Sequence, residues 1–276
     1  WSLHSSCART SQMSGGEAVP DHLLVQASVR SLQPWYCSFH DHIKQSFHVI
    51  EADLRVIELA DVLRHLSTAD PSTGLIDVQG FYHRKHEEPQ ELADSAAVTI
   101  ELVTQIQHAL NIGFKPTHVD THMLTLIHPR FLHIYLETAY QFGLPAMMAR
   151  YGQEEWIRKG FTAAEADVLK SIVHEFEEQG YPMLDSFGGL KLAEASDRFE
   201  QAKQALADLP AGIHHFYIHP SLDTPEARAI SPDWQARVAD YETFLNPNLN
   251  KFLKNEGIQT IGYRAIEAWM PAGNGN

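Results

Sequence analysis

The chain has 276 residues, of which 44% are hydrophobic and 20% are charged, a composition that is ordinary for a soluble protein with a sizeable core. Its formal net charge of -14 argues against binding to nucleic acid or to an anionic membrane surface, because both are themselves negatively charged. The 17 histidines are a high count, which favours metal or acid/base chemistry.

Cysteine usage and hydropathy indicate where the protein works. Cys7 and Cys37 form neither a metal-binding spacing nor a disulfide framework, which fits a reducing cytoplasm. No apolar run reaches membrane-spanning length, and the N-terminus lacks a basic region followed by an apolar one, so we expect no secretory signal. A cytoplasmic location without nucleic acid or membrane partners is therefore expected.

The N-terminal third has weak periodicity. Residues 1–22 show no helical or strand pattern and are expected to form an irregular segment, followed by one domain over residues 23–270. Within the domain's first part, the patterns favour strands at 23–29 and 49–57 and helices at 34–47 and 59–66.

From residue 89 onward the pattern becomes regular. Residues 89–110 predict an amphipathic helix with Gly113 just beyond its end. Its expected buried stripe consists of Leu92, Ala96, Ile100, Val103, Ile106 and Leu110. A strand at 117–123 comes next, and then a helix with Pro129 in its first turn. That second helix is expected to bury Phe131, Leu132, Tyr135, Leu136 and Ala139.

The C-terminal half continues to alternate between strands and helices. Thr162 and Glu165 form a capping box that opens a helix. Strands are expected at 144–149, 181–187, 213–219 and 258–263, and further helices at 196–209, 232–245, 247–255 and 265–269. This alternation predicts a parallel sheet with helical crossovers, and the number of units favours a single-domain α/β fold, a (β/α) TIM-like barrel, over an open sheet.

Residues 115–129 contain the densest group of side chains that could act in catalysis or metal binding. If 117–123 is a strand, the side chains of His118, Asp120 and His122 share one face. An imidazole, a carboxylate and an imidazole on one face can ligate a divalent metal or serve as an acid/base pair. The alternative is a polar strand end with ordinary hydrogen bonds.

His219, at the end of the predicted strand 213–219, is a second candidate. Both His122 and His219 come just before a loop, at the carboxyl end of a strand, where α/β folds place their sites. His219 is a candidate general acid, or else a residue that merely caps a strand end. Arg237 and Asp240, at i and i+3 on a helix, are expected to pair at the surface.

The motifs resemble those of the YdjC/ChbG family of carbohydrate deacetylases. Residues 116–122 (Pro-Thr-His-Val-Asp-Thr-His) are similar to that family's Pro-Thr-His-hydrophobic-Asp-Ser-His signature. Further blocks that match in order lie at 72–82, 129–145, 217–220 and 237–242. The resemblance covers about residues 70–267, and the shared order of the blocks makes it specific.

The resemblance implies a deformed TIM-like barrel that holds a divalent metal cation, Mg²⁺ or Zn²⁺. The implied reaction is hydrolysis of an N-acetyl group on an amino sugar or chitooligosaccharide by attack of metal-bound water. By this resemblance the metal is held by an Asp and two His, of which His122 is one. Asp120 would orient or assist, and His219, near the catalytic site, is the candidate acid that releases the amine. His118 is our second candidate metal ligand, and a homodimer is a candidate assembly.

The N-terminal third departs from the family pattern. The family opens with an Asp-Asp motif, whereas residues 3–9 here contain no carboxylate, and Ile57 stands where a second block supplies a metal-binding His. Three explanations stay open: a divergent or inactive homologue, an early coding region that is truncated or shifted in frame, or substitute ligands. The substitutes would be His4, Glu58 or Asp61.

Three function classes follow. The first is an active metal-dependent deacetylase. The second is a catalytically inactive sugar-binding homologue that lacks the N-terminal ligands. The third is a scaffold whose histidines are structural.

Overall fold

The structure is a computed structural model that describes residues 22–26, 66–68, 70–83 and 85–271. The elements expected between residues 34 and 65 lie outside these ranges, as does the irregular segment apart from its last residue, His22, which begins a strand.

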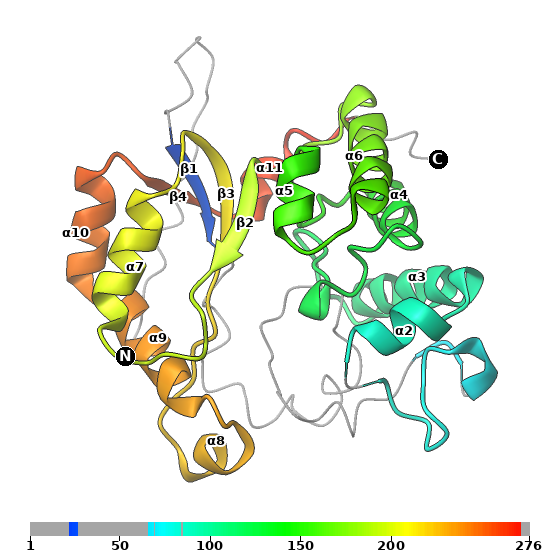
Figure 1. Cartoon of the computed structure of the whole chain (residues 1–276), viewed down its shortest axis with the longest axis horizontal. Helices are drawn as coiled ribbons and strands as arrows, with labels where there is room; N and C mark the ends of the chain where they lie inside the picture. Colours follow the sequence, from blue (N-terminus) through cyan, green and yellow to red (C-terminus); the bar gives the residue numbers. More distant parts are fainter. Residues whose placement is uncertain (1–21, 27–65, 69, 84, 272–276) are drawn as a thin grey trace.

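Four parallel strands form the sheet at the centre of the described residues (Figure 1). They are β1 (His22–Gln26), β2 (Ser186–Gly189), β3 (Gly212–Tyr217) and β4 (Gln259–Ile261). Their order is β2-β3-β1-β4, and each neighbouring pair is parallel. The predicted parallel sheet is therefore confirmed, and β2, β3 and β4 are shorter than the sequence pattern indicated.

Two further segments extend the sheet beyond β2 through isolated parallel bridges. Val119 pairs with Ala146, and Ala149 pairs with Leu184, just ahead of β2. Backbone bonds of 2.9 Å from Met147 N–H to the Val119 carbonyl, and from Leu184 N–H to the Met148 carbonyl, hold these bridges. The run of parallel segments thus begins at Val119 and ends at β4. Within the described residues, no pairing joins the segment at Val119 to β4, so the closed barrel stays a prediction.

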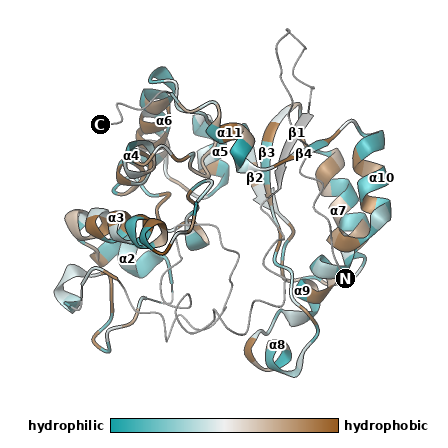
Figure 2. Ribbon diagram, turned by 180° about the vertical axis from the view of Figure 1, so that it is seen from behind, coloured by the Kyte–Doolittle hydropathy of each residue, from teal (hydrophilic) through white to brown (hydrophobic). Residues whose placement is uncertain are grey.

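Helices cover both sides of this sheet. They are α2 (Glu87–Leu92), α3 (Ser95–Asn111), α4 (Leu132–Gln141), α5 (Gln153–Arg158), α6 (Ala163–Glu178), α7 (Arg198–Ala207), α8 (Pro225–Ile230), α9 (Trp234–Leu245), α10 (Pro247–Asn255) and α11 (Tyr263–Glu267). Figures 1 and 2 show α7 and α10 on one side of the strands and α3, α4 and α6 on the other. None of the described helices has both the length and the hydropathy that a membrane crossing requires.

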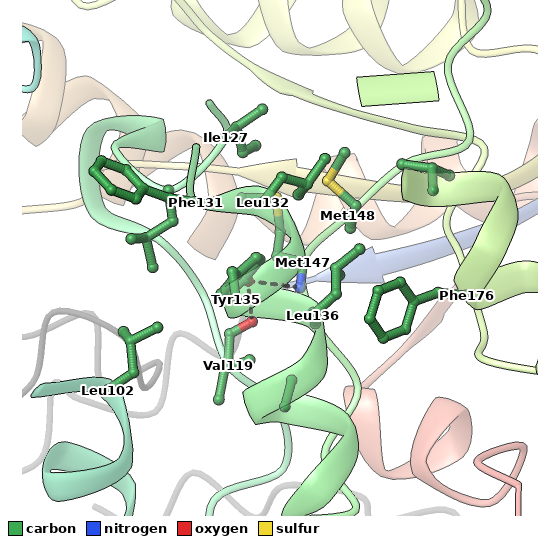
Figure 3. Close-up of a cluster of buried hydrophobic side chains, with 14 of the residues drawn as sticks. Leu102, Val119, Ile127, Phe131, Leu132, Tyr135, Leu136, Met147, Met148 and Phe176 are labelled. Carbon is green, nitrogen blue, oxygen red and sulfur yellow. Dashed lines mark hydrogen bonds between the residues drawn. The ribbon is translucent and has the colours of Figure 1, made fainter. Parts of the chain in front are cut away.

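The main core lies between the sheet and α3, α4 and α6 (Figure 3). All five predicted core residues of the second helix are buried, which confirms that prediction: Phe131, Leu132, Tyr135, Leu136 and Ala139. The helix itself begins only at Leu132, so Pro129 lies in the turn before it rather than in its first turn. A second, smaller core lies between the other face of the sheet and α7 and α10, and includes Phe216, Ile218, Leu206 and Leu249.

The predicted buried stripe of the first long helix is mostly wrong. Leu92, Ile100 and Leu110 are exposed, and of the stripe only Ile106 is fully buried. The buried face instead contains Val98, Glu101, Leu102, Gln105, Ile106 and Ala109. Of the polar members of this face, Glu101 reaches the core because its carboxylate has hydrogen-bond partners there. The Glu101 carboxylate accepts hydrogen bonds from Gln105 Nε2 at 2.9 Å and from the Tyr82 hydroxyl at 2.5 Å.

The capping box that opens α6 is confirmed. The Thr162 hydroxyl accepts a bond from the Glu165 N–H at 3.3 Å, and the Glu165 carboxylate accepts one from the Thr162 N–H at 2.8 Å. The two side chains satisfy backbone groups that the first helical turn leaves without intrahelical partners.

Candidate functional site

The candidate residues lie where parallel segments end, at what we call the carboxyl edge of the sheet. Asp120 and His122 follow the segment at Val119, and His219 follows β3 by two residues. Because the segments run parallel, their carboxyl ends meet at one edge, which is where α/β folds bind ligands.

The strand predicted at 117–123 is much shorter than expected. Val119 alone pairs with a neighbour, and His122–Leu124 forms a 3₁₀ turn, η5. Met123 and Leu124 adopt positive φ values of 52° and 59°, so the backbone cannot continue as a strand there. The strand on which the expected shared face of His118, Asp120 and His122 depended is therefore not formed as predicted.

His118 lies inside the protein. Its side chain is buried, its Nδ1 is 3.0 Å from the Thr117 hydroxyl, and its ring stacks on Tyr263 with centroids 3.6 Å apart. Burial, followed by the effect of nearby His215, holds the pKa of His118 well below its usual value. The imidazole is therefore neutral at pH 7.

Tyr263 also joins His118 to β3. The Tyr263 hydroxyl is 2.8 Å from His215 Nδ1, and burial lowers the pKa of His215 to about 4. A neutral imidazole has one nitrogen that donates and one that accepts, so the tautomer of His215 decides whether Nδ1 or the Tyr263 hydroxyl is the donor. His118, Tyr263 and His215 form a buried group of three rings, which we call the ring cluster.

A row of rings leads from the ring cluster to the carboxyl edge. His215, Tyr217 and His219 alternate along the chain and so share one face. Their ring centroids are 6.4 Å apart for the first pair and 5.6 Å for the second. The intervening Phe216 and Ile218 pack into the smaller core on the opposite face. The His219 side chain therefore belongs to the same side of β3 as the ring cluster.

Asp120 and His122 are closer to solvent. Asp120 is half-buried and its Oδ1 accepts the Thr121 N–H at 2.6 Å, whereas His122 is exposed. The Thr121 hydroxyl in turn accepts the Leu126 N–H at 2.9 Å, which fixes the loop after Val119. Burial, together with the negative charge of Asp120, raises the pKa of Tyr135 well above its usual value.

His219 is held through its backbone. Its N–H donates to Asp240 Oδ2 at 2.9 Å, and Arg198 Nε donates to Asp240 Oδ1 at 2.6 Å. The side chains of Asp240 and Arg198 are 0% and 2% exposed. The surface pair expected between Arg237 and Asp240 is therefore wrong, since Arg237 is buried and donates to Asp233 at 2.6 Å and 2.8 Å.

Sequence reasoning missed Tyr263 and Arg198. Tyr263 follows the end of β4 by two residues, and a systematic search of strand ends would have found it. Arg198 gives no such signal, because its partner Asp240 lies 42 residues away on another helix.

The described residues supply metal donors of the right kind but not a complete site. A carboxylate and an imidazole stand two residues apart at Asp120 and His122. Within the described ranges, however, no three His, Cys, Asp or Glu side chains gather as a metal site requires. The places where the resemblance puts the other ligands, about residues 3–9 and 52–58, lie outside those ranges.

Comparison with known proteins identifies relatives over most of the chain. A family model described as YdjC-like protein matches residues 29–255. A carbohydrate deacetylase of Thermus thermophilus is 30% identical over 192 residues, which are 70% of this chain and 68% of that protein. A carbohydrate deacetylase of Thermoanaerobacter pseudethanolicus is 20% identical over 207 residues, 75% of each chain.

One solved structure shares the fold. A crystal structure of a protein of Enterococcus faecalis, described as a candidate cellobiose-phosphate cleavage protein, superposes with a TM-score of 0.54 at 15% identity. The match covers 74% of this chain and 72% of that one, and at this identity it speaks to the fold alone.

Proposed function

The chain belongs to the YdjC-like family, and we propose that it hydrolyses N-acetyl groups on amino-sugar oligosaccharides. The observation that carries the proposal is the identity of 30% to a protein named carbohydrate deacetylase. The membership itself was predicted from the motif order and is confirmed.

The carboxyl edge supports this chemistry. Asp120 and His122 follow one parallel segment and His219 follows another, so acid/base groups from two segments face one edge. We assign His122 as a metal ligand and Asp120 as the group that orients it or the attacking water. His219 protonates the leaving amine as general acid. The role of His118 as a second metal ligand stays a prediction. Its ring stacks on Tyr263, which supports a role for His118 in positioning the loop that follows Val119.

The proposal includes a divalent cation, Mg²⁺ or Zn²⁺. Held at His122, the cation would lower the pKa of a water molecule and polarise the acetyl carbonyl. Asp120 would orient the donors, and His219 would hold the proton that the departing amine takes up. Of these groups, His219 is buried enough for its proton to be shielded from bulk water.

Acetate release tests the proposal. The purified chain is incubated with N-acetylated chitooligosaccharides, with and without added Mg²⁺ or Zn²⁺ and with a chelator, and acetate and free amine are both measured. We expect equal amounts of the two products, lost on chelation and in His122→Gln and His219→Gln. His133→Gln, on the exposed part of α4, is the matched control and keeps activity. A folded wild-type chain that releases neither product contradicts the proposal.

The second candidate is a sugar-binding homologue without catalysis. Ile57 stands where the resemblance places a metal-binding His, and this observation favours the candidate. It predicts that calorimetry with chitooligosaccharides shows binding that a chelator leaves unchanged. A scaffold with structural histidines predicts neither sugar nor metal binding.

Two further proposals concern architecture. We propose that the parallel segments close into a deformed (β/α) barrel and that the chain forms a homodimer. An experimental structure of the whole chain tests the first, and sedimentation velocity tests the second.

A further inference from the structure

A buried ion pair contacts the chain at His219. Asp240, from α9, has no exposed surface, and its two carboxylate oxygens have different partners. One accepts from Arg198 Nε at 2.6 Å and the other from the His219 N–H at 2.9 Å. The carboxylate thus joins α7, which carries Arg198, to the end of β3.

Arg198 extends this connection to a second strand end. Its Nη1 donates to the backbone carbonyls of Lys191 at 2.7 Å and Glu194 at 2.9 Å. Both carbonyls belong to the segment that follows β2. The pair therefore fastens the segments that leave two neighbouring strands, and both leave at the carboxyl edge.

The direction of the His219 side chain makes this connection relevant to chemistry. The backbone of His219 is fixed on the Asp240 side, while its ring lies at the end of the row that passes through Tyr217. The His219 N–H is fixed by Asp240, and the centroid of its ring lies 5.6 Å from that of Tyr217. Together these two contacts restrict the position of the imidazole.

We propose that Asp240 and Arg198 are positioning residues that hold the His219 imidazole in its reactive place, an inference that rests on the proposed function. Neither residue touches the reacting atoms. Asp240 acts through the His219 N–H, and Arg198 acts by holding Asp240 and the segment after β2.

Measurements of stability alone cannot distinguish a positioning role of this ion pair from a purely structural one. Replacing a buried ion pair with uncharged groups of similar volume is often neutral for stability. The chain offers a comparison pair at the start of the same helix, where Arg237 donates two hydrogen bonds to Asp233, the residue that precedes α9. No bond of the Asp233 side chain reaches His219 among the contacts of the described residues.

The test compares variants in the acetate-release assay with the full chain. Asp240→Asn removes the charge and replaces one accepting oxygen with an NH2 group, so the side chain can no longer accept both the Arg198 bond and the His219 N–H bond. Arg198→Gln combined with Asp240→Asn avoids leaving the Arg198 charge without its partner and serves if the single variant does not fold. Asp233→Asn is the control. Circular dichroism and thermal unfolding establish which variants fold.

If the proposal is right, the folded Asp240 variant loses kcat by about tenfold to a hundredfold with KM changed less than about twofold, since small misplacement of a catalytic group costs rate. Asp233→Asn keeps kcat within about twofold, the range of a change remote from the site. In a His219→Gln background the Asp240 substitution has no additional effect on the residual rate, because a residue that acts through another is not additive with it.

Three results overturn the proposal. They are wild-type kcat in a folded Asp240 variant, equal losses in the Asp240 and Asp233 variants, and an undiminished Asp240 effect in the His219→Gln background. If the wild-type chain releases no acetate, both the proposed function and this inference are wrong. If the wild type is active and any of the three results is found, only the inference is wrong.

Discussion

The ring of Tyr263 stacks on the imidazole of His118, with centroids 3.6 Å apart and planes inclined by 10°. His118 precedes the first segment of the parallel run, and Tyr263 follows β4, the last strand in that run. Five strand spacings separate these ends, which in a flat sheet would be about 24 Å. The sheet is therefore strongly curved, and the two rings meet on its inner side.

The hydroxyl of Tyr263 should contribute separately from its ring. Tyr263→Phe keeps the stack on His118 but removes the hydrogen bond with His215, which is 2.8 Å long. Leaving a buried polar group without its hydrogen-bond partner costs about 1–3 kcal/mol. Tyr263→Ala removes the ring as well and should cost roughly 3–5 kcal/mol. Urea unfolding measures both, and equal costs for the two variants would show that the stack contributes nothing.

Stability should fall in mild acid because of His215. Burial lowers its pKa from the ordinary 6.5 to about 4 in the folded protein. Between these values an unfolded His215 binds more protons than the folded one, so its contribution to the free energy of unfolding decreases as the pH falls from 6.5 to 4 and stays constant below that range. The slope from this group is at most about 1.4 kcal/mol per pH unit.

The variant His215→Phe isolates this effect. It removes the titrating ring while keeping a ring of similar size, so the slope of unfolding free energy against pH between 6.5 and 4 should be smaller than in the wild type. Identical slopes would mean that His215 does not carry the acid sensitivity.

The Tyr135 hydroxyl holds the first two parallel segments together. It donates to the Val119 carbonyl at 2.8 Å and accepts the Met147 N–H at 3.2 Å, as the dashed lines of Figure 3 show. Tyr135→Phe should lower the free energy of unfolding by about 1–3 kcal/mol. Tyr140→Phe, on the same helix, is the control, since its hydroxyl has no hydrogen bond among the described residues. A cost for the Tyr140 variant that matches that of Tyr135 contradicts this assignment.

Glu101 should control local opening at residues 66–67. Its carboxylate accepts the Leu66 N–H at 3.1 Å and the Ser67 N–H at 2.8 Å. Burial acts to raise the pKa of Glu101, but hydrogen bonds from Ser67, Tyr82 and other donors lower it further, so the group is ionised near neutral pH.

Glu101→Gln replaces one accepting oxygen with a donor, so amide exchange at residues 66–67 should become at least about tenfold faster, which corresponds to losing about 1.4 kcal/mol. Glu137→Gln, whose carboxylate bonds Gln141 on the surface of α4, leaves this exchange unchanged. Unchanged exchange in the Glu101 variant would show that the segment is held by other contacts.

Local signals in the sequence predicted local structure well. The Thr162 capping box places the start of α6, and Pro247 in the first turn places α10 at the predicted residues 247–255. The apolar residues of α4 are buried as the helical period indicates. These features depend on neighbours within a few residues, so the sequence alone contains them.

Long-range partners are what the sequence could not supply. Glu101 is buried because Tyr82 and Ser67 donate hydrogen bonds to its carboxylate, whereas the neighbouring Ile100 is exposed. Hydropathy periodicity predicts the opposite, a buried Ile100 and an exposed Glu101. The turn at His122 depends on positive φ values at Met123 and Leu124, which neither residue type favours. The placement of His122 and His219 at strand ends was predictable, whereas the bond from His219 to Asp240 was not.

The deacetylase proposal is tested most directly by acetate release from N-acetylated chitooligosaccharides by the wild-type chain and by its His219→Gln variant, each with a divalent cation present. We expect the wild type to release acetate and free amine in equal amounts, and the variant to lose at least about a hundredfold in rate, the usual scale for a general acid. A folded wild type that releases no acetate, or a His219→Gln variant as active as the wild type, would contradict the proposal.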